Sequence, residues 1–291
     1  MMIQETLLSF ITIAIELTIL FLGISFLIYL FQGFIPYERM ESLMDKSHPL
    51  ISAGIAVLFA FVTPFCSCST IPIVVHLLRN HIRFPIVMIF LFASPVLDIT
   101  ILTLMTAILG WKVALFYTLI TSTLSIIVGF SLHGLGFEKQ LKPVIMENYS
   151  PPTSTNKVNV NRAILETWAH MKSVYPFLII GAAIGAFIHG VVPEEWITDY
   201  MGGEHWWLVP IAAVLGLPLY IRLSTMIPIS QMMIAKGMAL GPVMALMISS
   251  AGASLPEVTL LHSIFKKKLV FTFVGSVIAM STLSGFLFYL I

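Results

Sequence analysis

The chain has 291 residues, of which 58% are hydrophobic and only 10% are charged, and its formal net charge is +1. A soluble domain carries roughly 25% charged residues, and one globular core cannot hide this much apolar surface. The composition therefore excludes a soluble enzyme and a disordered tail, and the small net charge gives no field that would recruit nucleic acid. We expect a multi-pass membrane protein.

The first apolar run, residues 7–35, is predicted to be a retained membrane helix. It exceeds the roughly 20 apolar residues that span a bilayer. The residues before it contain no Lys or Arg, whereas a secretory signal peptide has a positively charged start. We therefore expect no cleavage.

Apolar runs and their interruptions predict six long spans and two pairs of shorter pieces, eight to ten helical segments in all. Most short pieces cannot cross ~30 Å of hydrocarbon at about 1.5 Å per residue. Clustered Pro, Cys, Ser, Thr or Arg interrupt each pair, which is typical of discontinuous helices or re-entrant hairpins. The long spans are 7–35, 84–109, 112–136, 164–192, 240–263 and 269–291, and the short pairs are 50–65 with 70–78 and 206–220 with 224–235.

The two halves of the chain resemble each other. Pro85 and Pro242 keep the offset that separates Gly33 from Gly190, and a Ser-Thr pair followed by Pro recurs at 69–72 and 224–228. Each half contains three long helices and a broken pair, an odd number of segments, so the second half is predicted to be inverted. The expected fold is an all-α polytopic membrane protein with a first repeat at 1–136, a cytoplasmic linker at 137–161 and an inverted second repeat at 162–291.

Loop charge predicts the orientation, because cytoplasmic loops collect Lys and Arg. With both termini outside the cell membrane, twelve of the 15 basic residues fall on the inner face. These are Arg39, Lys46, Arg79, Arg83, Lys139, Lys142, Lys157, Arg162, Lys172, Lys266, Lys267 and Lys268.

The substrate site is predicted where the two interrupted pairs meet near the middle of the membrane. Both interruptions end in a Ser-Thr pair ahead of a Pro, a combination that starts helices. Two helix N-termini would then point at the site and favour an anionic or strongly dipolar solute. The candidate substrate-binding residues are Cys66, Ser67, Cys68, Ser69 and Thr70 in the first interruption and Tyr220, Arg222, Ser224 and Thr225 in the second.

Cys66 and Cys68 are the two cysteines of the chain. Two soft thiols could capture a thiophilic centre such as trivalent arsenic or Cu(I). The alternative is that small residues allow close helix packing where the chain breaks. Zinc would need four ligands, and no second Cys pair is available, so no resident metal and no cofactor is expected.

Two acids at membrane depth are candidates for ion coupling, because such residues are expensive there and functional by default. Asp98 and Glu257 follow similar small-residue and Pro segments of the two halves. Either could carry a coupling proton, while Arg222 could hold a substrate anion. The alternative is a structural ion pair.

The motifs also resemble those of a known family. Pro64-Phe65-Cys66-Ser67-Cys68 and Phe92-Ala93-Ser94-Pro95, with residues 71–73, 218–222 and 251–257, are similar to the predicted-permease family that includes YraQ and the organoarsenical efflux permease ArsP. Ser69 and Ser224 depart from its pattern, where a Gly and an acid are common. The resemblance, closest to the YraQ branch, implies a permease, with organoarsenical export as one activity.

The resulting interpretation is a secondary transporter, not an enzyme, that moves a small polar, anionic or thiophilic solute by alternating access. No nucleotide-binding P-loop motif occurs, so an ion gradient or a partner chain would supply energy. The alternative is a membrane thiol-disulfide oxidoreductase using Cys66 and Cys68, and a channel is a third option. The expected partners are the solute, the lipid bilayer and a coupling ion, with a second copy of the chain left open and nucleic acid excluded.

Overall fold

The computed structural model of the protein describes part of the chain. The described residues are 48–62, 70, 73–75, 77–78, 82–142, 206–218, 223–235 and 237–290, together with 15, 18, 19, 22, 23, 26, 164 and 168. The predicted spans 7–35 and 164–192 therefore lie almost wholly outside the described residues.

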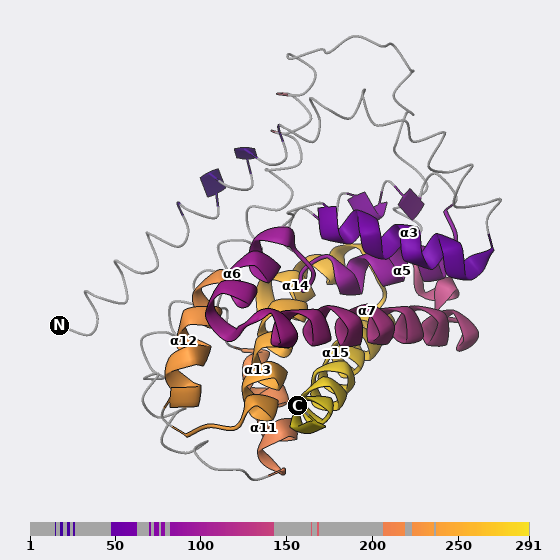
Figure 1. Ribbon diagram of the computed structural model, residues 1–291. Coiled ribbons are helices and arrows are strands. Elements are labelled where there is room, and N and C mark those ends of the chain that lie inside the picture. Colours follow the sequence, from indigo (N-terminus) through magenta and orange to yellow (C-terminus); the bar gives the residue numbers. More distant parts are fainter. Residues whose placement is uncertain are drawn as a thin grey trace.

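Nine α-helices and two short 3₁₀ helices make up the described part of the chain (Figure 1), which confirms the all-α prediction. The first-half helices are α3 (Pro49–Val62), α5 (Phe84–Ala93), α6 (Ile99–Leu109) and α7 (Trp111–Gly134), followed by η1 (Phe137–Gln140). The second-half helices are α11 (Leu208–Gly216), α12 (Leu223–Ala235), α13 (Leu240–Gly252), α14 (Leu255–Ile264) and α15 (Lys267–Leu287), followed by η2 (Phe288–Leu290).

Helices α7 and α15 are, among the described residues, the two that are long and apolar enough to cross a membrane. They have 24 and 21 residues, and a rise of about 1.5 Å per residue takes both past ~30 Å of hydrocarbon. They match the predicted spans 112–136 and 269–291. The predicted short pair of the second half is also confirmed as the separate helices α11 and α12.

The prediction of continuous helices over 84–109 and 240–263 was wrong. The first stretch is divided into α5 and α6 by a turn at 94–96, and the second into α13 and α14 by Ala253 and Ser254. Pro95 lies in the first interruption and Pro256 lies in the first turn of α14. Proline lacks the N–H for a helical hydrogen bond and clashes with the preceding turn, so each Pro favours the end of one helix and the start of another.

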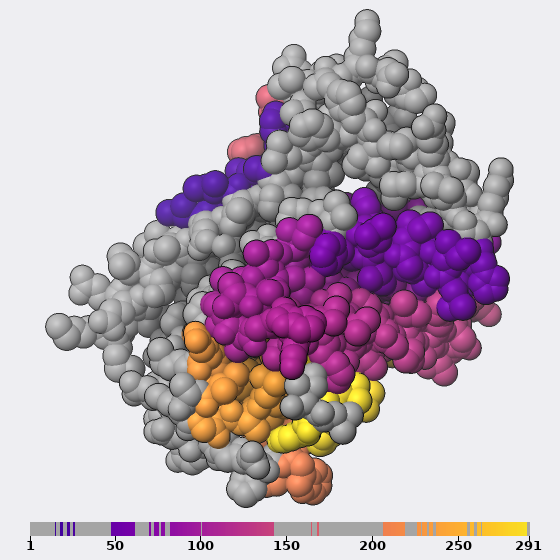
Figure 2. Space-filling model, in the orientation of Figure 1, coloured from indigo at the N-terminus to yellow at the C-terminus, as the bar shows by residue number. Residues whose placement is uncertain are grey.

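The same helix pairs form in both halves. Helix α3 packs on α5 as α11 packs on α13, α5 packs on α7 as α13 packs on α15, and α6 packs on α7 as α14 packs on α15. Figure 2 shows the first-half helices, in purple and magenta, lying over the second-half helices in orange and yellow. Each half thus wraps its shorter helices around one long helix.

A glycine on each long helix allows the same close approach. A Cβ added to Gly129 of α7 would lie 3.0 Å from the carbonyl oxygen of Pro85. A Cβ added to Gly285 of α15 would lie 2.8 Å from the carbonyl oxygen of Gly241. The same sequence separation relates both pairs, so the two halves share this contact and not only the order of their helices.

Helices α7 and α15 run side by side in opposite directions. Phe116 lies near the start of α7 and Phe288 lies after the end of α15. Their rings pack edge to face with 5.2 Å between the ring centroids. At the other end, the backbone N–H of Lys266 donates to the carbonyl of Gln140 at 2.9 Å. The segments after α7 and before α15 therefore lie together.

This arrangement gathers basic residues at one end of the two long helices. The N–H of Lys142 donates to the carbonyl of Ile264 at 3.1 Å, and an isolated antiparallel bridge joins Leu141 to Phe265. These contacts hold two of the predicted basic segments next to each other. We call this cluster the basic end, and it consists of Lys139, Lys142, Lys266, Lys267 and Lys268.

Replacing Gly285 by Ala is expected to lower the free energy of unfolding by about 1–3 kcal/mol, because the new methyl group has to displace backbone at Gly241. Gly275→Ala on the same helix is the matched control, since nothing lies within 4 Å of its Cβ position. That control should be neutral or stabilising by up to about 1 kcal/mol. Thermal unfolding in detergent measures both, and equal midpoints for the two variants would contradict the close packing.

Candidate functional site

The two interruptions that divide α5 from α6 and α13 from α14 meet inside the molecule. A Cβ added to Gly252, at the end of α13, would lie 3.8 Å from Cγ2 of Val96 in the first interruption. The same Cβ would lie 3.1 Å from Cγ1 of Val277 on α15. We call residues 94–97 and 252–254 the paired breaks.

Backbone polar groups of the first break form hydrogen bonds with other groups of the protein. The N–H groups of Val96 and Leu97 donate to the carbonyl of Ala93 at 3.1 and 2.8 Å. The hydroxyl of Tyr117, a completely buried residue of α7, donates to the carbonyl of Val96 at 3.0 Å. Hydrocarbon cannot satisfy such groups, so these bonds stabilise an interrupted helix at membrane depth.

A buried hydroxyl pair ties the first break to another part of the predicted site. The Oγ1 of Thr70 lies 3.1 Å from the Oγ of Ser94, and both residues are buried. Thr70 was predicted to bind substrate, whereas Ser94 was not singled out. The signal that could have found Ser94 is Pro95 beside it, within an otherwise apolar run.

An acidic residue follows each break. The carbonyl of Asp98 accepts the N–H of Leu102 at 3.0 Å, so Asp98 stands immediately ahead of α6, and it is half-buried. Glu257 lies in the first turn of α14 and is completely buried. A helix N-terminus carries partial positive charge, which stabilises a carboxylate there. Asp98 thus stands just ahead of α6, as Ser254 stands ahead of α14, whereas Glu257 is the third residue of α14.

Ser254 adds a buried polar group that sequence reasoning missed. Its carbonyl accepts the N–H of Val258 at 2.9 Å, so the residue caps α14. Its Oγ is buried and has no hydrogen-bond partner in the part of the chain that the structure describes. Buried polar groups in folded proteins usually have a hydrogen-bond partner, so this hydroxyl is a distinctive feature of the second break.

The other predicted substrate-binding residues are described little or not at all. Ser224 and Thr225 belong to the first turn of α12, which agrees with the predicted helix start, but nothing is described of their side chains. Helix α12 packs on α6 and α13, the helices that flank the paired breaks (Figure 1). Outside the described residues lie Cys66, Ser67, Cys68, Ser69, Tyr220 and Arg222.

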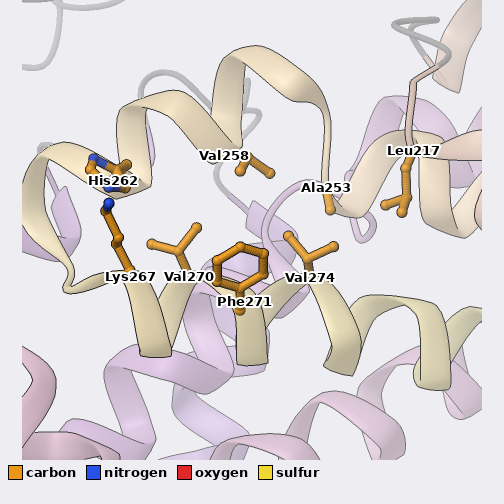
Figure 3. Close-up of a pocket in the computed structure, with 8 residues that line it drawn as sticks. All are labelled: Leu217, Ala253, Val258, His262, Lys267, Val270, Phe271 and Val274. Atoms are coloured by element: carbon orange, nitrogen blue, oxygen red, sulfur yellow. The ribbon is translucent and has the colours of Figure 1, made fainter.

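A cavity of about 520 Å³ connects the second half of the site to the basic end. Figure 3 shows its lining, with Leu217 and Ala253 at one end and His262 and Lys267 at the other. The volume falls within the range of ligand pockets. Within the described residues no group of three or more His, Cys, Asp or Glu side chains could hold a metal ion.

Comparison with known proteins places this arrangement in a family. A family model described as a predicted permease matches residues 2–290. A UPF0718 protein of Methanocaldococcus jannaschii is 21% identical over 355 aligned positions, which cover 98% of this chain and 97% of the relative. No solved structure matches the chain.

A second relative comes from Streptococcus mutans. It is 22% identical over 280 positions, covering 91% of this chain and 90% of the relative. Its name assigns it, provisionally, to a two-component membrane permease complex as a subunit.

Proposed function

Because the chain belongs to the predicted-permease family, we propose that it is a secondary transporter that moves a small polar, anionic or thiophilic solute by alternating access. The observation that carries the proposal is the contact between the paired breaks, each followed by an acid. Interrupted helices that meet inside a membrane protein are the usual place for a substrate and its coupling ion. Membership of a permease family favours this function over a thiol-disulfide oxidoreductase.

Two inverted repeats, at 1–136 and 162–291 on either side of a cytoplasmic linker, would give the transporter its two alternating states. The antiparallel pair α7 and α15 supports this part of the proposal, because these helices hold the same place in the two halves. The break of one half would then face one side of the membrane, and the break of the other half would face the opposite side. Rocking of one half against the other would open the site alternately.

The paired breaks would form the binding and coupling centre. Glu257 or Asp98 would carry the coupling proton. Thr70 and Ser254 would contribute hydroxyl groups to the binding site. Cys66 and Cys68 would bind a thiophilic solute, with Ser67, Ser69, Tyr220, Ser224 and Thr225 around it and Arg222 as the counter-charge for an anion. Efflux of trivalent arsenicals is the activity that these thiols favour.

A partner chain is an alternative source of driving force. The relative from Streptococcus mutans is named as a subunit of a two-component complex. Co-purification of the full chain with an unrelated membrane subunit would support that alternative over ion coupling.

The transport function is tested by expressing the chain in a strain that lacks it and exposing the cells to arsenicals, antimonials and small thiols. The wild type should lower the cellular content of a trivalent methylarsenical, and Glu257→Gln should abolish the effect because the side chain can no longer release a proton. Glu138→Gln is the control, since Glu138 is 57% exposed at the basic end.

Two outcomes would contradict the proposal at different points. Unchanged efflux by Glu257→Gln would reject the coupling role of the buried acid. Unchanged efflux by Cys66→Ser and Cys68→Ser would reject thiol binding and leave these cysteines as packing residues.

The inverted arrangement predicts which positions share a side of the membrane. In a Cys66→Ser, Cys68→Ser background, Lys139→Cys and Lys268→Cys should both resist an impermeant maleimide in intact cells, because their segments pair at the basic end. Lys112→Cys, at the opposite end of α7, should react. Labelling of Lys139→Cys and Lys268→Cys from opposite sides would overturn the topology.

A further inference from the structure

The cavity between α14 and α15 is lined by apolar side chains, as a binding site for a hydrocarbon chain would be. Val258 of α14 faces Val270, Phe271 and Val274 of α15 across it (Figure 3). Phe271 is 77% exposed, so the cavity is a groove open at the surface and not a hole in the core. An exposed apolar groove on a membrane-crossing helix adjoins lipid.

One end of this groove is strongly cationic. His262 and Lys267 line it there, and both are exposed. The Nζ of Lys142 donates to the carbonyl of His262, which brings a second lysine to the same place. The Nζ of Lys266 donates to the carbonyl of Lys139 at 3.3 Å, so the whole basic end is held together.

Few opposing charges offset these cations in the described segments. Residues 137–142 contain one acid, Glu138, and its carboxylate lies 3.5 Å from Nδ1 of His133. Helix α15 begins at Lys267, and the N-terminus of a helix carries partial positive charge. Together they make an anion site above an apolar groove.

We propose that the groove binds an acyl chain of an anionic phospholipid, whose phosphate group lies among His262, Lys267 and the rest of the basic end. Lysine clusters at the end of membrane helices recognise acidic headgroups, and the adjoining groove supplies the contact for the tail. A zwitterionic lipid would bring a cationic group to the same lysines. Inorganic phosphate would lack the tail, so both halves of the site are complementary to an acidic lipid alone.

Native mass spectrometry of the purified full chain tests the proposal with phosphatidylglycerol, phosphatidylcholine of matched chains and inorganic phosphate. Phosphatidylglycerol should remain bound while the other two do not. Replacing Lys266, Lys267 and Lys268 by Ala should weaken its binding on the order of 100-fold, since each basic group near acidic lipid contributes about a factor of five. Lys112→Ala, at the other end of α7, should leave it unchanged.

A second pair of variants tests the groove separately from the charges. Phe271→Ala should weaken phosphatidylglycerol binding about tenfold, because burial of its ring against the tail is lost. Leu283→Ala is the matched control, as it removes an exposed apolar side chain elsewhere on α15. Equal binding of phosphatidylcholine, equal effects of the two variants, or a second copy of the chain in place of lipid would overturn the proposal.

Discussion

An interrupted helix inside hydrocarbon has backbone groups that no water can satisfy, and this constraint organises the whole molecule. The first break meets it with its own turn bonds to Ala93 and with the hydroxyl of Tyr117 on the carbonyl of Val96. A Cβ at Gly252 would lie 3.8 Å from Val96 and 3.1 Å from Val277 of α15, so the second break lies beside the first break and beside a long helix. At the first break, the long helix α7 therefore supplies the hydrogen-bond donor that water would otherwise supply.

The long helices can do this because they approach the shorter ones closely. Gly129 and Gly285 let α7 and α15 lie against the starts of α5 and α13, at equivalent places in the two halves. Small residues at helix contacts are the usual means of close packing in membranes, where apolar side chains gain little by leaving lipid. The same packing leaves polar groups of the breaks, such as Ser94 and Ser254, buried among helices.

Composition and the residues that interrupt the apolar runs were enough to predict the membrane class, the two long helices and the separate helices α11 and α12. They failed at 84–109 and 240–263, because a uniformly apolar run has no periodicity that reveals a break. Pro95 and Pro256 carried the missing signal. The basic segments at 139–142 and 266–268 were predicted on one side from charge alone, and their backbone pairing confirms that they lie together.

The candidate site was predictable only in part. Asp98 and Glu257 could be identified because a carboxylate is rare in an apolar sequence; Asp98 directly precedes α6 and Glu257 lies in the first turn of α14. The bond between Thr70 and Ser94 joins residues 24 positions apart. No local pattern predicts such a bond, since it depends on how separate helices pack. The Ser254 hydroxyl, which is buried and has no hydrogen-bond partner among the described residues, is likewise not predictable from a local pattern.

The central claim is that the paired breaks touch. Cross-linking Val96→Cys with Gly252→Cys, in a Cys66→Ser, Cys68→Ser background and with a membrane-permeant oxidant, tests it directly. Rapid disulfide formation is expected for this pair, because the Cβ position of Gly252 lies 3.8 Å from a side-chain atom of Val96. Val96→Cys with Gly275→Cys, whose Cβ position has no neighbour within 4 Å, should not react. Equal reaction of both pairs, or none of the first, would contradict it.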